Sequence, residues 1–95
     1  MRTLRFARGA RRDLEAAIAF IENENPQAAL ALLGRIREAA ELLRHFPGAG
    51  RPQSMPGVRL LQVSGTAYGV VYREQPERIT ILRIWHGAQA WPPGS

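Results

Sequence analysis

Residues that could do chemistry gather in the C-terminal half of the chain. They are arginines and aromatic residues on segments of alternating polarity: Arg51, Arg59, Tyr68, Tyr72, Arg73, Arg83, Trp85, His86 and Trp91. Arginine and tyrosine on a sheet can hold RNA by phosphate contacts and base stacking. With an arginine stabilising the phosphorane and His86 exchanging a proton, the same group could also cleave RNA. The alternative is a purely structural role, in which the aromatic residues pack in the core and the arginines are solvated on the surface. Residue types alone do not decide between the functional and the structural interpretation.

The sequence lacks the residues that several other kinds of active site require. Cysteine is absent, which excludes a disulfide, a thiolate metal site and a cysteine nucleophile. His45 and His86 have no ligand partner at metal-binding spacing, so we expect no metal site, and His45 is better explained as a helix C-terminal residue. No nucleophile elbow or glycine-rich phosphate loop occurs, and we expect no cofactor. Asp13 and Glu15 are interpreted as acids that favour a helix N-terminus.

The charge points to an anionic partner. All 13 basic residues are arginine, against 8 acidic residues, and the formal net charge is +5. Such a balance fits nucleic acid or an acidic protein segment and does not choose between them; coding bias alone can also produce it. The 95 residues suit one domain, residues 1–95. No apolar run approaches a membrane span and no signal peptide is evident, so we expect a cytoplasmic protein without membrane contact.

Hydrophobic periodicity predicts the elements that position these side chains. Residues 2–6 alternate like a strand, and an apolar stripe predicts a helix from about Arg8 to about Asn23. Asn25 followed by Pro26 starts a second helix, which must end before Pro47. The stripes are Ala10, Leu14, Ala17, Ile18 and Ile21 in the first helix and Ala29, Leu32, Leu33, Ile36, Ala40 and Leu43 in the second. Residues 46–57 read as a loop, and strands are predicted at 58–63, 67–74 and 78–85.

The order β-α-α-β-β-β predicts an α+β fold, with a helical hairpin packed on one face of a small antiparallel sheet. Alternation divides the last strand into two sets, Ile79, Ile81, Arg83 and Trp85 against Thr80, Leu82, Ile84 and His86. Both sets are largely apolar. One hairpin covers only one face, so we expect the other face to keep apolar area for a partner, unless residues 46–57 or the C-terminal tail fold across it.

Motifs along nearly the whole chain, from about Arg5 to Pro92, then suggest a family. They are ARRDLEAAIAFI, PQAAL, FPGAGRP, GVRLLQV, AYGVVYRE and ITILRIWHGAQAWP. In this order and spacing they resemble the RelE/ParE toxin superfamily of bacterial type II toxin-antitoxin systems. The resemblance implies a cognate antitoxin, ParD-like or similar, whose acidic amphipathic segment wraps and neutralises the toxin. It implies contact with DNA only indirectly, through the antitoxin.

The branch of the superfamily decides the implied activity. RelE-like members resemble ribosome-dependent mRNA endoribonucleases with several basic residues on the sheet, but here Leu61, Gly69 and Gln89 stand where such residues are expected. The PQAA motif, the P-G-x-G-R-P segment and the tail from Arg83 to Gly87 resemble ParE-like members instead. That branch implies inhibition of DNA gyrase and a role in plasmid stabilisation.

We therefore predict a protein-binding gyrase inhibitor without a catalytic site of its own. The alternative is a RelE-type mRNA endoribonuclease that uses Arg59, Arg73, Arg83 and His86. Antitoxin contacts are assigned to Arg59, Arg73, Arg83 and Trp85, and target contacts to His86, Gln89 and Trp91. No residue is assigned to a metal.

Overall fold

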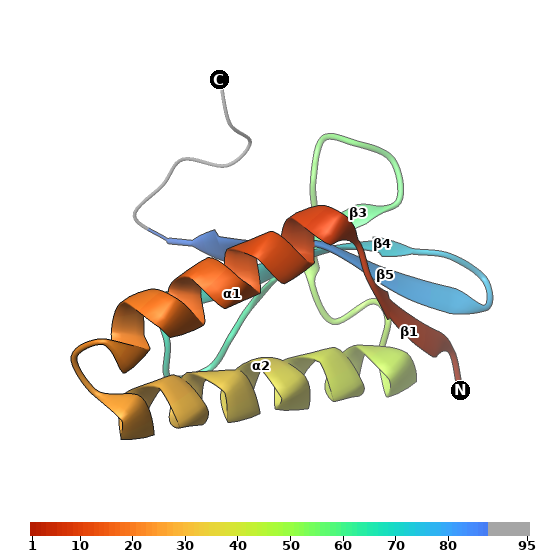
Figure 1. Cartoon of the computed structure of the whole chain (residues 1–95). Helices are drawn as coiled ribbons and strands as arrows, with labels where there is room; N and C mark the ends of the chain where they lie inside the picture. The colour runs from red at the N-terminus through yellow and green to blue at the C-terminus, as the bar shows by residue number, and fades with distance from the viewer. Residues whose placement is uncertain (88–95) are drawn as a thin grey trace.

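The computed structural model describes residues 1–87, which form two helices against a five-stranded sheet (Figure 1). In chain order the elements are β1 (Thr3–Phe6), α1 (Arg8–Glu22), α2 (Pro26–His45), β2 (Arg51–Pro52), β3 (Val58–Gln62), β4 (Tyr68–Glu74) and β5 (Arg78–His86). The predicted α+β class and the order of helices and strands are confirmed. The short strand β2 is an addition, because it forms inside the segment predicted as a loop.

Both helices bury the stripes predicted for them. In α1, Ala10 and Ala17 are buried, and the three larger residues of the stripe pack partly buried against the core. The α2 helix starts at Pro26, and the side chain of Asn25 accepts a hydrogen bond of 3.1 Å from the backbone N–H of Ala28. This cap satisfies one of the free amides of the first turn. Its last turn holds Arg44 and His45, as expected for His45.

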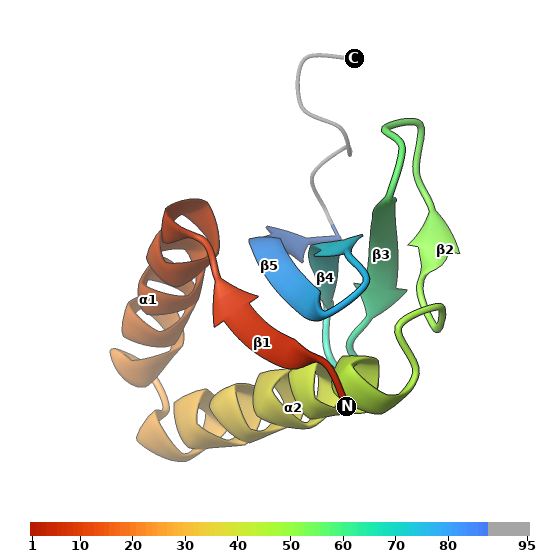
Figure 2. The same cartoon turned by 90° about the vertical axis from the view of Figure 1, so that its right-hand side faces the viewer.

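The sheet is mixed rather than purely antiparallel. Its strand order is β1-β5-β4-β3-β2, and β1 pairs with β5 in parallel, from Thr3 opposite Arg78 to Phe6 opposite Ile81. The remaining neighbours are antiparallel. The two helices connect β1 to the rest of the sheet, so no hairpin turn dictates the direction of β1. Figure 2 shows β1 beside β5, with α1 and α2 on one side of the sheet.

An irregularity in β5 changes which residues face the helices. Val71 pairs with Arg83 but Tyr72 pairs with Ile81, so the register skips Leu82 at a β-bulge. Ile81 and Ile84 consequently both belong to the helix-facing core, although they are three residues apart. The expected uniform alternation along this strand is therefore wrong. The bulge begins where β1 ends, since Phe6 is opposite Ile81.

The face away from the helices holds a small apolar cluster of its own. Val58, Val71 and Trp85 are 1%, 0% and 8% exposed, with Leu60 and Leu82 packed against them. Leu60 and Leu82 remain partly exposed, so this face keeps apolar area in water at the margin of the cluster, while Val58, Val71 and Trp85 are covered. Exposed large hydrophobic residues of the described chain lie elsewhere: Met1, Phe20, Leu30, Leu42, Phe46 and Met55.

Candidate functional site

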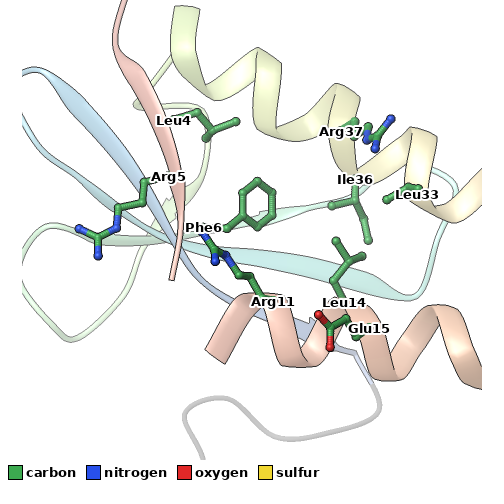
Figure 3. A pocket seen from close by; sticks show the side chains of 9 residues that line it. All are labelled: Leu4, Arg5, Phe6, Arg11, Leu14, Glu15, Leu33, Ile36 and Arg37. Atoms are coloured by element: carbon green, nitrogen blue, oxygen red, sulfur yellow. The ribbon is translucent and has the colours of Figure 1, made fainter. Parts of the chain in front are cut away.

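A groove lies between β1 and the two helices (Figure 3). It has a volume of about 520 Å³, and its apolar lining comes from all three elements: Leu4, Phe6, Leu14, Leu33 and Ile36. Arg11 and Glu15 of α1 and Arg37 of α2 also line it. Arg5 of β1 lines the groove too, and in Figure 3 its side chain extends from β1 on the side away from Phe6. An apolar floor with cationic groups around it suits an amphipathic segment that carries carboxylates.

The free edge of β1 runs beside this groove. The backbone N–H groups of Thr3 and Ala7 donate to the carbonyls of Glu77 and Ile81, at 3.0 and 2.8 Å, on the β5 side. Because successive N–H groups of a strand point in opposite directions, those of Leu4 and Phe6 point to the outer edge. An outer edge with unpaired backbone groups is a template for an added strand.

A second arrangement joins α1 to β5 beyond the end of β1. The carboxylate of Asp13 accepts hydrogen bonds from Nε and Nη2 of Arg83, at 2.7 and 3.0 Å, and from the backbone N–H of Ile84 at 2.9 Å. The hydrogen bond to Asp13 raises the pKa of Arg83. The interpretation of Asp13 as a helix-dipole partner is wrong, because Asp13 lies beyond the first turn of α1. Its carboxylate instead accepts hydrogen bonds from β5, beyond the point where the pairing of β1 with β5 ends.

Arg83 also covers the apolar cluster of the second face. Its guanidinium carbon lies 5.2 Å from the centroid of the Trp85 ring, within cation–π range. The guanidinium thus bridges the helical layer and the second face around the sheet edge. Two of its three nitrogens, Nε and Nη2, already donate to Asp13.

Arg59 lies on the other side of the sheet, where it holds the loop after α2. Its Nε contacts Oε1 of Glu74 at 3.1 Å, and its Nη1 donates to the Gly50 carbonyl at 2.9 Å. The neighbouring Tyr72 hydroxyl donates to the Pro47 carbonyl at 2.7 Å and accepts from the Gly50 N–H at 2.9 Å. Burial raises the pKa of Tyr72, so the hydroxyl stays protonated. Both side chains therefore fix the conformation of this loop.

The remaining assigned residues are spread over different surfaces. Arg73 is exposed on the second face, where its Nη1 lies 3.4 Å from the Pro56 carbonyl. His86 makes an edge-to-face contact with Tyr68 at 5.1 Å and lines a hollow of about 250 Å³ beside α1. Gln89 and Trp91 lie outside the described residues.

The four residues of the nuclease alternative are thus not brought to one place. Arg59 and His86 lie on the helix side of the sheet, and Arg73 and Arg83 start from the second face. Of the four residues assigned to the antitoxin, Arg73, Arg83 and Trp85 start from the second face and Arg59 from the helix side, and Trp85 is buried. Their roles stay predictions.

The described part of the chain shows neither a metal cluster nor a membrane-spanning helix. Residues 1–87 contain no group of three or more histidine, cysteine, aspartate or glutamate residues arranged to hold a metal ion. Within the same residues, neither helix combines the length and apolar character needed to cross a membrane.

Comparison with known proteins decides the family. The family described as the ParE toxin of the type II toxin-antitoxin system parDE matches residues 4–91. The chain belongs to the ParE toxin family. This confirms the resemblance on which the ParE-like branch was chosen. The ParE-family chain also has the fold of a solved relative: the chromosomal ParDE toxin-antitoxin system from P. aeruginosa matches it with a TM-score of 0.78 and 32% identity, over 90% of this chain and 96% of that one.

Two curated relatives cover nearly the same span. A candidate toxin of Sinorhizobium fredii, Y4kP, is 33% identical over 89 residues, or 94% of this chain and 92% of the relative. Toxin RelE3 of Caulobacter vibrioides is 34% identical over 91 residues, or 94% and 98% of the two chains. Relatives of this ParE-family chain therefore carry both ParE and RelE names, and the choice of target rests on the residues of the chain itself.

Sequence reasoning missed the groove and the role of Asp13. Arg11 and Arg37 carry no local signal, since they belong to different helices and line the groove together with β1 only in the folded chain. Asp13 and Arg83 are 70 positions apart, and opposite charge alone cannot single out such a pair. The bulge at Leu82 carries no sequence signal either, and a shift of one residue moves the side chains that follow to the opposite face.

Proposed function

We propose that this ParE-family chain is a toxin that binds and inhibits DNA gyrase and that a cognate antitoxin, ParD-like or similar, neutralises it in the cytoplasm. One observation carries the choice against a RelE-type nuclease. The guanidinium groups of Arg59 and Arg83 are occupied by Glu74 and Asp13 on different sides of the sheet. A phosphorane needs its stabilising cations and its proton donor around one point, so a dispersed set favours action by binding.

The groove between β1, α1 and α2 is the surface we assign to the antitoxin. Its apolar floor fits the apolar face of a segment, and the edge of β1 offers the N–H groups of Leu4 and Phe6 to an extended backbone. No ion pair among residues 1–87 involves Arg11 or Arg37, so both can meet carboxylates of an acidic partner. Contacts of the antitoxin with Arg59, Arg73, Arg83 and Trp85, the set expected from the sequence, remain a second prediction.

Target contacts are assigned to the C-terminal end of β5 and the residues after it. His86, Gln89 and Trp91 are the proposed contacts, and only His86 lies within the described chain. The hollow that His86 lines also includes Phe20 of α1, whose side chain is 74% exposed. An exposed aromatic residue beside a hollow is typical of a protein-binding surface.

Two assays run in parallel test the function. Purified toxin is added to gyrase with relaxed plasmid, and separately to a translation reaction with a labelled message. We expect loss of supercoiling and an increase in cleaved plasmid, restored to normal by the antitoxin, while the message stays intact. Normal supercoiling at saturating toxin, together with codon-dependent cleavage of the message that an His86→Ala variant loses, would establish the RelE-type alternative.

A further inference from the structure

The second face of the sheet carries a row of arginines, of which only Arg73 appears among the predicted antitoxin contacts. Arg5 of β1 and Arg73 of β4 are both opposite Thr80 of β5, one on each side. The neighbours of Arg5 in the chain, Leu4 and Phe6, pack into the helix-facing core, so Arg5 itself points to the second face. By the same alternation Arg73 points there too, since Tyr72 belongs to the helix-facing core.

Arg78 adds a third cation to this row. It precedes the core residue Ile79 and lies opposite Thr3, which places it on the second face two residues from Thr80. Neighbouring strands are about 4.8 Å apart and alternate residues of one strand about 7 Å, so the three arginines start within about 10 Å of Thr80. All three are exposed. We call Arg5, Arg73 and Arg78 the arginine row.

No acidic side chain offsets the arginine row within the described strands. The two acidic residues nearest in sequence lie on the helix side: Glu74 contacts Arg59, and Glu77 lines a hollow with Arg44 and His45. None of the ion pairs among residues 1–87 includes a member of the row. Within the arginine row, the Arg73 side chain contacts the Pro56 carbonyl at 3.4 Å. Three uncompensated cations on a rigid sheet make a local positive field.

The aromatic residues indicate which polyanion fits. Single strands are held by bases that stack on exposed aromatic rings, but on this face Trp85 is 8% exposed and packed into the apolar cluster. The exposed aromatic residues of the described chain, Phe20 and Phe46, belong to α1 and to the C-terminal end of α2. A protein partner would also need an apolar anchor near the centre of its interface, and the partly exposed Leu82 of this face lies only at one end of the row, two residues beyond Thr80. Cations without a stacking platform suit a duplex, whose bases are covered and whose phosphates are outside.

We propose that the arginine row binds the phosphodiester backbone of duplex DNA, so that this chain contacts DNA directly and without reading its sequence. This departs from the expectation that DNA is reached only through the antitoxin. Arg73 and Arg78 do not line the groove assigned to the antitoxin, whereas Arg5, on the edge strand, belongs to its lining as well. Direct contact would add to the affinity of the toxin for any DNA-bound target, but the binding itself requires neither gyrase nor antitoxin.

The test is the salt dependence of binding between the full-length toxin and a short fluorescent duplex, measured by anisotropy. Each phosphate contact contributes about −0.9 to the slope of log K against log salt, so three contacts predict a slope of about −2.7. In the Arg5→Gln/Arg78→Gln variant we expect a slope of about −0.9, with at least a tenfold loss of affinity at low salt. Glutamine keeps most of the side-chain stem, and circular dichroism verifies that the variant is folded.

The matched control is Arg12→Gln/Arg35→Gln, which removes the same charge from exposed positions on the two helices. It is expected to keep the wild-type slope. An equal loss in both double variants would show a general effect of net charge and overturn the proposal, as would absence of duplex binding by the wild type at low salt. Tighter binding of a single-stranded RNA of equal length, or equal competition by polyglutamate, would also overturn it. No gyrase is present, so the outcome is independent of the supercoiling assay.

Discussion

The carboxylate of Asp13 on α1 holds both the guanidinium of Arg83 and the backbone N–H of Ile84 on β5. One side chain thereby neutralises a strand arginine and takes the place of the strand that is missing beyond Phe6. The side chain of Asp13 is 18% exposed, so its hydrogen bonds are only partly in competition with water. This contact fastens the helical layer to the C-terminal end of the sheet, where the proposed target contacts begin.

Replacing Asp13 should therefore destabilise the fold. For Asp13→Ala we expect the free energy of unfolding to fall by about 1–2 kcal/mol, because Arg83 loses its partner and the Ile84 N–H its acceptor. Urea unfolding followed by circular dichroism measures the change. The control is Glu22→Ala, on the same helix and in no ion pair of the described chain, with an expected change within about 0.5 kcal/mol. Equal stability of the two variants would rule out the proposed role of Asp13.

The limits of prediction from this sequence follow from the range of the interactions involved. The helices and their stripes were predictable because Asn25, Pro26 and the spacing of apolar residues act within a few positions of each other. The parallel pairing of β1 with β5 was not, since it joins positions more than 70 residues apart without a turn to constrain them. The skip at Leu82 then decides the faces of Arg83 and Trp85. The groove and the arginine row both arise from these two long-range features.

Tyr72 makes a pH dependence at alkaline pH predictable. Burial raises its pKa in the folded chain above the ordinary value of 10.0, whereas the unfolded chain retains that value. Folding favours the protonated hydroxyl, and this preference stabilises the folded chain. The stabilisation is complete below pH 10 and is lost as the pH rises from 10 towards the pKa of Tyr72 in the folded chain. We expect unfolding free energy to decline over that interval. The Tyr72→Phe variant, less stable at neutral pH through loss of two hydrogen bonds, should show a smaller decline; an identical decline in both proteins would contradict this assignment.

The loop after α2 offers a test with two neighbouring glycines. A Cβ on Gly50 would lie 2.8 Å from Tyr72 Cε1 and hydroxyl and 3.0 Å from the backbone of Leu60, whereas one on Gly48 would meet nothing within 4 Å. We expect Gly50→Ala to cost about 1–3 kcal/mol, since the clash is with a fixed ring and with backbone. Gly48→Ala should change stability by no more than about 0.5 kcal/mol. Thermal unfolding of both variants distinguishes them, and similar melting temperatures would show that the loop is not held in the described conformation.

The groove assigned to the antitoxin can be tested by reversing one charge at its margin. Arg37 lines the groove and enters no ion pair of the described chain, and Arg35, two residues away on α2, lies outside its lining. In Arg37→Glu the positive charge that meets the acidic segment becomes a repulsive one. We expect the affinity for the antitoxin to fall at least about tenfold, mainly through faster dissociation, corresponding to about 1.4 kcal/mol or more.

The Arg35→Glu variant makes the same charge change on the same helix and should bind the antitoxin within about threefold of the wild type, apart from a slower association through the altered net charge. Calorimetric titration gives the affinities and stopped-flow mixing the rates. Gyrase inhibition by the free Arg37→Glu toxin should be unchanged, because Arg37 lines the groove whereas His86, the proposed target contact, lines a separate hollow. If both variants lose affinity equally, only long-range charge is involved. If neither does, the antitoxin binds elsewhere, and the set of Arg59, Arg73, Arg83 and Trp85 becomes the surface to test.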